Sequence, residues 1–401
     1  APGAPVLSTT CWSVLPVTSA TTCMLEYFEK LGGTRAANPE SNYLVMDHYV
    51  PYPNNKVAAL QKSMSDFAHC GQAQLLPLGE GICHQLLPER GCIHPGSIVI
   101  GGDSHSTTYG AFNALGMGVV SSILAAGIMA GSLWFRVPES IRVKRHRKLS
   151  KNVTAKDLAL TIVGELGASG AAYQAVEFQF DGENPLRVEE RMTVCNLMAE
   201  TGAKCAIMPG DEQLAEYLEN VGVHACEFVL PDEDAVYART LEIDLNAVEP
   251  VVACPHRVDL VEPVRGLSDT PVQMGLLGTC TNGRISDFRA ALDILDGRQL
   301  CPDFQLLVVP ASRKIYVEMA ENRMLARFAE LGAIILPPSC GPCCGSSSGT
   351  PSDGVNVIST ANRNFIGRMG NVKSNIYLAS PATVAASAIT GKITDPREVF
   401  A

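Results

Sequence analysis

Three cysteines in this chain of 401 residues have the spacing that a metal cofactor requires. Cys340 and Cys343 form a Cys-x-x-Cys pair on a Gly/Pro turn, so both thiolates can point at one metal centre. Cys280 lies far away in the sequence, but it also follows an apolar, strand-like run. Three thiolates could hold three irons of a cubane cluster and leave the fourth iron without a protein ligand. An open metal position is typical of a catalytic site, whereas structural sites are closed.

The same cysteines allow two plainer interpretations. A buried thiol beside a turn explains a lone Cys-x-x-Cys about as well as a metal does. A structural zinc is the other alternative, with Cys254 or His256 as the fourth ligand, because zinc takes four ligands. Cys344 directly follows Cys343 and cannot easily point at the same centre, so we interpret it as a neighbour and not a ligand.

Acid–base chemistry is indicated where carboxylates stand beside imidazoles. Asp47-His48 and Asp103-Ser104-His105 each place a carboxylate where it can orient a ring and favour its protonated form, as a general acid requires. Either pair alone is more often a hydrogen-bonded turn. His84 and Glu200 stand alone in the sequence, and they are candidates only because these carboxylate–imidazole pairs are also present.

Two further groups could bind substrate or support a cofactor. Arg363 and Arg368 offer guanidinium groups, which suit bidentate binding of a carboxylate; the plain alternative is a surface loop. Asn196 shares a face with Glu200 on a predicted helix by its i, i+4 spacing. No P-loop or full dinucleotide fingerprint occurs, so no nucleotide is indicated.

The elements that would position these residues follow a β/α rhythm, which predicts a mainly parallel sheet. The strands expected are 41–46, 97–100, 272–277, 305–309, 333–336, 355–359 and 375–379. The helices expected are 22–31, 54–69, 119–135, 154–167, 192–200, 209–221 and one opened by Ser380-Pro381. Up to Ser19 the chain is rich in proline and hydroxyl residues and is expected to be irregular. The basic run 142–148 is interpreted as one solvated hairpin face.

The candidate groups share one position relative to the predicted strands. Each of these follows soon after a strand: Asp47-His48, Asp103-Ser104-His105, Cys280, Cys340/Cys343 and Asn362-Arg363. In open α/β sheets, ligands bind outside the carboxyl ends of the strands. The sequence therefore predicts that these five groups meet at one site.

Composition favours a compact soluble protein, with 46% hydrophobic and 18% charged residues. A net charge of −10 disfavours nucleic acid as a partner, and no apolar stretch reaches the ~20 residues of a membrane span. Fourteen cysteines without a recognisable secretory signal indicate a cytoplasmic or other reducing location. Most other cysteines are expected to be small buried hydrophobes, namely Cys70, Cys92, Cys195, Cys205, Cys226 and Cys301.

Four segments, taken in order, resemble motifs of the aconitase superfamily: Gly101-Gly102-Asp103-Ser104-His105, Gly278 to Arg284, Cys340-Gly341-Pro342-Cys343 and Ser359 to Arg368. Val194 to Glu200 resembles the family's middle-domain segment. The resemblance covers the chain from about Val17 to the end, and together the motifs are highly specific. Within the superfamily the chain is most similar to the large subunits of 3-isopropylmalate dehydratase and their relatives.

This resemblance implies an α/β fold of three domains around a central iron–sulfur site, placed here at residues 1–138, 139–249 and 250–401. The family's swivelling fourth domain, with its base serine and a further substrate-binding arginine, has no counterpart in this chain. We therefore expect a separate small subunit, equivalent to that swivel domain, to complete the site. Relatives carry an acidic residue where Leu15-Pro16 stand here, so we expect a shortened N-terminus or a diverged segment.

The resemblance also implies a hydro-lyase with a [4Fe-4S] cluster held by Cys280, Cys340 and Cys343, with one iron not bound by protein. The positions that match catalytic groups of the family are Asp47, His48, His84, Asp103, His105 and Glu200. Those that match substrate-binding groups are Ser104, Arg363 and Arg368, and those that match cluster-supporting amides are Asn196, Asn282 and Asn362.

The resulting hypothesis is a hydro-lyase or isomerase acting on a small 2-hydroxy di- or tricarboxylic acid, with 3-isopropylmalate as the first substrate. Homocitrate or homoaconitate, 2,3-dimethylmalate, citraconate or maleate, and citrate stay open. A competing class is a non-catalytic relative that binds RNA without its cluster, and a third is a zinc-stabilised binding scaffold. The acidic balance and the intact set of site residues argue against the RNA-binding class.

Overall fold

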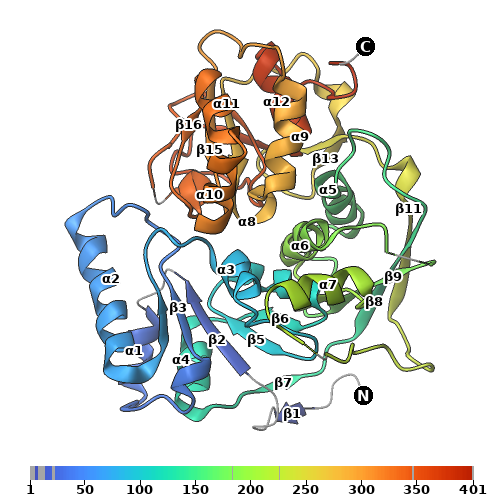
Figure 1. The fold of residues 1–401 in the computed structure, drawn as a ribbon. Helices are drawn as coiled ribbons and strands as arrows, with labels where there is room; N and C mark the ends of the chain where they lie inside the picture. Colours follow the sequence, from blue (N-terminus) through green and yellow to red (C-terminus); the bar gives the residue numbers. More distant parts are fainter. Residues whose placement is uncertain are drawn as a thin grey trace.

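The computed structural model describes residues 5–7, 14–19, 23–182, 184–224, 226–345 and 347–399. The strands form three larger sheets and one short ladder, in which β1 (Pro5–Leu7) pairs antiparallel with β7 (Trp134–Arg136). The three sheets lie at the lower left, at the right and at the top of Figure 1. Each lies within one of the ranges 1–138, 139–249 and 250–401. The domain boundaries themselves remain a prediction.

The N-terminal sheet has five parallel strands in the order β4-β3-β2-β5-β6. Its strands are β2 (Val14–Ser19), β3 (Tyr43–Val45), β4 (Gln74–Leu76), β5 (Ile98–Gly101) and β6 (Leu115–Gly118). Its helices are α1 (Cys23–Lys30), α2 (Asn55–Phe67), α3 (Cys83–Glu89) and α4 (Ser121–Ala130). The Asn54 side chain begins α2 by accepting a hydrogen bond from the Val57 N–H at 3.0 Å.

Two expectations about this part of the chain are wrong. Residues 14–19 are not irregular, because they form the central strand β2 between β3 and β5. Pairing on both sides overrides the weak strand propensity of a segment that contains Pro16. The helix expected over 119–135 is limited to α4, and Val120, Ile123 and Trp134 are exposed.

The middle sheet also has parallel strands, in the order β10-β9-β8-β11. Its strands are β8 (Ser140–His146), β9 (Ala175–Phe180), β10 (Cys205–Ile207) and β11 (Arg239–Asp244). Its helices are α5 (Ala155–Leu166), α6 (Val188–Leu197) and α7 (Glu212–Asn220). A capping box between Thr154 and Asp157 begins α5.

Two further expectations fail in this region. The basic run 142–148 is not a hairpin face, because β8 lies inside the sheet and alternate side chains point inward. Arg145 is buried and its guanidinium packs against the rings of Phe178 and Phe180. The helix expected over 192–200 ends at Leu197 and continues as a 3-10 turn, Met198–Thr201, so Glu200 lies outside the α-helix.

The C-terminal sheet has seven strands in the order β13-β12-β18-β17-β14-β15-β16. The antiparallel edge is β12 (Val251–Ala253) and β13 (Val261–Pro263). The parallel strands are β14 (Met274–Gly278), β15 (Gln305–Val309), β16 (Ile334–Ile335), β17 (Asn356–Ser359) and β18 (Asn375–Leu378), as predicted. The helices are α8 (Thr279–Asn282), α9 (Ile285–Leu295), α10 (Arg313–Glu321), α11 (Met324–Glu330) and α12 (Pro381–Thr390).

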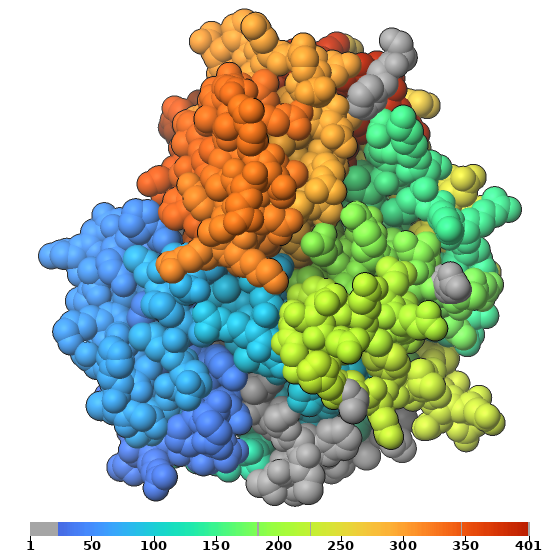
Figure 2. Space-filling view, viewed as in Figure 1, coloured from blue at the N-terminus to red at the C-terminus, as the bar shows by residue number. Residues whose placement is uncertain are grey.

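The C-terminal region, coloured orange in Figure 2, rests on both other regions, blue and green. The described cysteines form no disulfide, as expected. Of the six that were predicted to be buried, Cys195 and Cys205 are, whereas Cys70 is exposed and the other three are half-buried. Among the described residues, no helix is long and apolar enough to cross a membrane.

Candidate active site and cluster site

The three predicted metal ligands follow the carboxyl ends of two parallel strands of the C-terminal sheet, β14 and β16, which are separated by β15. Cys280 is in α8, directly after β14, while Cys340 and Cys343 follow β16 on the turn that includes the 3-10 helix Gly341–Cys344. All three thiols are buried. The turn after β14 requires glycine at position 278, where φ is 121° and a Cβ would collide with the Val309 carbonyl.

Two asparagine side chains lie at two of these thiols, those of Cys280 and Cys343. Asn362 Nδ2 lies 3.3 Å from Cys280 Sγ, and its Oδ1 accepts from Cys343 Sγ at 3.6 Å. Asn196 Nδ2 lies 3.5 Å from Cys280 Sγ, and its Oδ1 accepts from Asn362 at 3.2 Å. The structure therefore brings two of the three predicted supporting amides, those of Asn362 and Asn196, to these thiols.

The spacing of the thiols distinguishes a single ion from a larger cluster. Two thiolates on one zinc lie about 4 Å apart, because each Zn–S bond is about 2.3 Å long. Within the described part of the chain, the one group of possible ligand atoms that all lie within 4.8 Å of one another is that of Asp47, His48 and Cys340. The three cysteine thiols do not form such a group, and neither Cys254 nor His256 joins one. This donor set fits a polynuclear cluster better than one zinc ion.

Asp47 and His48 form a compact pair beside the third thiol. His48 Nδ1 lies 2.7 Å from Asp47 Oδ1, and Asp47 Oδ2 accepts from the Cys83 N–H at 3.0 Å. The Cys340 N–H donates to the Asp47 carbonyl at 3.0 Å. Burial lowers the pKa of His48, but attraction to Cys340 and Asp47 outweighs burial and raises the pKa well above its usual value. We call these two residues the Asp47 pair.

A longer chain of hydrogen bonds joins the remaining candidates. Asp103 Oδ1 lies 3.2 Å from both His84 Nε2 and His105 Nδ1. His105 Nε2 lies 2.7 Å from Glu200 Oε1, which also accepts from Arg363 Nε at 2.8 Å. Arg363 Nη2 then donates to the exposed Ser104 Oγ at 2.8 Å. We call this set the Asp103 chain, and its members are Asp103, His84, His105, Glu200, Arg363 and Ser104.

The carboxylates of the Asp103 chain are held ionised. Burial would raise the pKa of Asp103, but hydrogen bonds from His105 and His84 lower it well below its usual value. Burial likewise opposes ionisation of Glu200, and His105 together with Arg363 outweighs it and lowers the pKa. Two fixed negative charges, those of Asp103 and Glu200, therefore lie in the chain that ends at the exposed Ser104.

Two predicted residues take different positions from the rest. Arg368 Nη2 lies 3.7 Å from Cys343 Sγ, and its guanidinium packs over Phe365, so this arginine is a neighbour of the thiol. The Asn282 amide donates to Asp287 at 2.8 Å and lines a small cavity with Glu189. The structure does not bring Asn282 to the thiols.

Sequence reasoning missed two buried residues that shape the site. Arg284 donates to the carbonyls of Cys280 and Thr281 at 2.9 and 2.8 Å and so fixes the cysteine turn. Its place at the end of the Gly278 to Arg284 motif was the available signal. The ring of Tyr109 packs 5.5 Å from that of His84, and nothing in its local pattern pointed to this.

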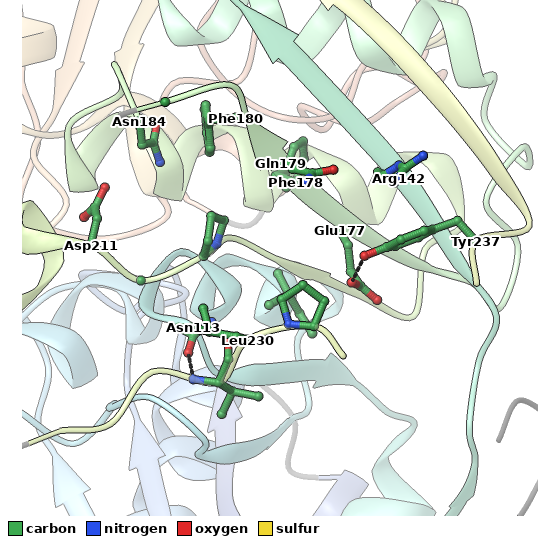
Figure 3. Close-up of a pocket in the computed structure, with 16 residues that line it drawn as sticks. Asn113, Arg142, Glu177, Phe178, Gln179, Phe180, Asn184, Asp211, Leu230 and Tyr237 are labelled. Atoms are coloured by element: carbon green, nitrogen blue, oxygen red, sulfur yellow. Dashed lines mark hydrogen bonds between the residues drawn. The ribbon is translucent and has the colours of Figure 1, made fainter. Parts of the chain in front are cut away.

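Cavities lie both beside the candidate site and away from it. One of about 580 Å³ is lined by Gly102 and Ser104 together with Val120, Tyr173 and Lys204. Another of about 460 Å³ lies against the middle sheet, where Glu177 and Tyr237 meet (Figure 3). None of the predicted site residues lines the second cavity. The first therefore gives the Asp103 chain its access to solvent.

The fold and the site together have the features of an α/β enzyme that holds a cysteine-bound metal cofactor beside acid–base groups. The chain belongs to the aconitase family: the family model, described as aconitate hydratase, matches residues 33–270 and 261–391. Members of this family are known for iron–sulfur clusters, and the buried thiols fit that property.

Individual relatives narrow the comparison. The chain is 41% identical to 3-isopropylmalate dehydratase large subunit 1 of Methanopyrus kandleri, over 93% of this chain and 90% of that protein. It is 42% identical to the probable methanogen homoaconitase large subunit of Methanosarcina mazei, over 93% and 95%. The crystal structure of holo aconitase X from Thermococcus kodakaraensis shares the fold, with a TM-score of 0.53 and 11% identity over 87% of this chain and 83% of that one.

Proposed function

We propose that this protein is the large subunit of an iron–sulfur hydro-lyase that moves water across a carbon–carbon double bond of a 2-hydroxy di- or tricarboxylic acid. The proposed substrate is 3-isopropylmalate, because several relatives at about 41–43% identity carry that name. A homoaconitase-type acid is the second candidate, since a relative of equal similarity is named as a homoaconitase.

The proposed cofactor is a [4Fe-4S] cluster held by Cys280, Cys340 and Cys343, with one iron not bound by protein. When bound, it would supply a Lewis acid for the substrate hydroxyl and carboxylate. Asn362 and Asn196 would donate hydrogen bonds to cysteine sulfur, as they do in this structure. This part of the proposal rests on the observation that the three buried thiols do not all lie within 4.8 Å of one another, as thiolates on a single ion would.

The Asp47 pair is the proposed proton donor to the leaving hydroxyl. The raised pKa of His48 keeps its imidazolium form available near neutral pH, and the buried Asp47 carboxylate holds the ring in place through Nδ1. His48 Nε2 is then the atom from which a proton leaves. His84, held at Nε2 by Asp103, would orient its ring toward the same hydroxyl or water.

The Asp103 chain is the proposed binder of a substrate carboxylate. Arg363 uses Nε and Nη2 within the chain, yet a guanidinium has five N–H donors, so it keeps donors for a ligand. Glu200 fixes the guanidinium plane, and Ser104 lies at the exposed end where a carboxylate would enter. Arg368, beside Cys343, would assist from the side of the thiols.

A small subunit is the proposed partner, because relatives are named as large subunits. It would supply the base that removes the proton from the carbon next to a carboxylate. Among the described residues, His48 and His84 are both held by carboxylates, so neither is free for that role.

The first test measures iron, acid-labile sulfide and zinc per chain after anaerobic reconstitution. Iron and sulfide in a cubane ratio, with absorbance that bleaches in air, would support the proposed cluster. Zinc without iron or sulfide would contradict the cluster proposal. The second test adds candidate small subunits and compares 3-isopropylmalate, homocitrate and citrate by kcat/KM. Turnover of none of these acids by any loaded pair would contradict the hydro-lyase proposal.

A further inference from the structure

Lys156 is a buried lysine that the acid–base groups do not include. It is the second residue of α5, and its side chain has no exposed surface. Its Nζ donates to the carbonyl oxygens of Thr360 and Ala361, at 2.7 and 2.6 Å. These residues directly precede Asn362 and Arg363 in the C-terminal region. One ammonium group therefore ties the middle region to the backbone that presents two site residues.

The same backbone is tied to the cysteine turn after β14. The Thr360 carbonyl also accepts from Thr281 Oγ1 at 2.7 Å, and the Thr360 hydroxyl accepts from the Gly278 N–H at 2.9 Å. Thr360 thus connects Lys156 to both ends of the turn that carries Cys280. A substitution of Lys156 would therefore affect the position of the Cys280 thiol as well as that of Asn362.

The charge of Lys156 is unusual for its surroundings. Among the described residues, its hydrogen bonds go to neutral carbonyls, while the oxygens of Asp157 and Asp287 accept bonds from other donors. Burial lowers the pKa of Lys156 to about 8, although Cys280, Cys343, Asp287 and Asp157 attract the charge. A buried charge is costly unless nearby opposite charge offsets it. Negative charge at the two thiols would therefore stabilise the ammonium group.

Cys280 and Cys343 have the opposite charge requirement. A thiol must lose its proton to bind a metal, so the two cysteines would carry negative charge near the Lys156 ammonium group when they hold one.

We propose that Lys156 positions and charge-balances the cluster site, an inference that rests on the proposed iron–sulfur function. Its two hydrogen bonds hold the 360–361 backbone so that the Asn362 amide stays between the thiols of Cys280 and Cys343. Its positive charge offsets that of the thiolates and of the cluster they hold. It contacts no reacting atom, so it is a positioning residue.

Two variants separate the two roles. Lys156→Met keeps the apolar stem and removes both the charge and the hydrogen bonds, whereas Lys156→Gln removes the charge and keeps an N–H donor. Lys204→Met is the matched control. Its Nζ also donates to a backbone carbonyl, that of Gly118 at 3.4 Å, and burial also lowers its pKa, but its neighbour is Cys205.

Three measurements report on the reconstituted and the cluster-free protein. Both Lys156 variants should lose iron and sulfide to a chelator about tenfold faster than wild type, the equivalent of one pKa unit of lost stabilisation. Their cluster midpoint potentials should shift to more negative values, because removing positive charge favours the oxidised form. In cluster-free protein, hydrogen exchange of residues 358–368 should rise in Lys156→Met and less in Lys156→Gln.

The charge role and the positioning role of Lys156 can each be contradicted separately. Cluster retention and midpoint potentials equal to those of wild type and Lys204→Met would overturn the charge role. Unchanged exchange over 358–368 in Lys156→Met would overturn the positioning role. A wild-type protein without iron and sulfide would refute the proposed function, and the exchange comparison would still decide the positioning role. If Lys156→Met does not fold, Lys156→Gln carries all three measurements.

Discussion

The Asp47 pair and the Asp103 chain both combine histidine with carboxylate, but they end differently. In the pair, Asp47 is fully buried and both its oxygens are occupied, one by His48 and one by the Cys83 N–H. The pair therefore ends inside the protein, against Cys340. The chain instead runs outward from buried His84 to Ser104, which is exposed beside a cavity.

This difference separates two kinds of task. A closed pair can hold one proton at one place, because its other contacts are fixed. An open chain that ends at an arginine and an exposed serine can accept an anionic ligand there without rearranging its buried end. We therefore expect changes in the pair to affect turnover and changes in the outer part of the chain to affect binding.

The largest effect should come from the thiols, which both groups border. Cys343→Ser should lose iron, sulfide and activity together, because serine is a poor ligand for iron in such clusters. Metal analysis and turnover with a small subunit would be measured on the same sample. Cys344→Ser, one residue away, is the control and should keep both. An active, cluster-containing Cys343→Ser would show that the ligand assignment is wrong.

The second-largest effect is expected in the steady-state kinetics, where substitutions in the Asp47 pair and in the Asp103 chain should differ. His48→Gln should lower kcat by about 10²–10⁴ with little change in KM, the usual size of a lost general acid. His105→Gln should both lower kcat and raise KM, since His105 connects Asp103 to Glu200 and so aligns Arg363. Steady-state kinetics on both variants, at matched cluster content, tests this. If the two variants shared one pattern, the proposed division of tasks would fail.

A smaller effect is expected at the outer end of the chain. Arg363→Lys keeps the charge but loses the planar fork, and it should raise KM by about 10–100-fold with a smaller change in kcat. Arg187→Lys is a matched control, because Arg187 also forms a two-oxygen pair, with Glu190, away from the thiols. A KM for Arg363→Lys close to that of the control would contradict carboxylate binding by Arg363.

Much of this arrangement was predictable from the sequence, because strand ends can be located from apolar runs. The parallel strands β14 to β18 and the polar residues that follow them were found by that rule, and the structure brings Cys280, Cys343 and Asn362 together. Parallel pairing aligns the carboxyl ends of the strands, so residues remote in sequence become neighbours.

The remainder depends on tertiary contacts that leave no local pattern. β2 contains Pro16 and is a strand only because β3 and β5 pair with it. Arg145 belongs to a basic run, yet its partners Phe178 and Phe180 lie on the next strand. The sequence gives no sign that Lys156 differs from an ordinary helix residue, because the carbonyls that accept its hydrogen bonds lie some 200 positions away.

The smallest predicted effect concerns acid stability and needs no cofactor. The pKa of Glu200 is lower in the folded protein than its unfolded value of about 4.3. Its ionised form therefore stabilises the fold above that pH, and the contribution is lost as the pH falls through the folded pKa. Glu200→Gln removes this contribution. Below about pH 4.3, the free energy of unfolding of the cluster-free variant should therefore fall less with decreasing pH than that of wild type. The difference should be roughly 2 kcal/mol, the size of a charged hydrogen bond. Urea unfolding at stepped pH measures it, and Glu26→Gln is the control, because the Glu26–Lys30 pair is exposed. A Glu200→Gln curve parallel to wild type would mean that His105 and Arg363 do not hold this carboxylate ionised, and the buried half of the Asp103 chain would lose its fixed charge.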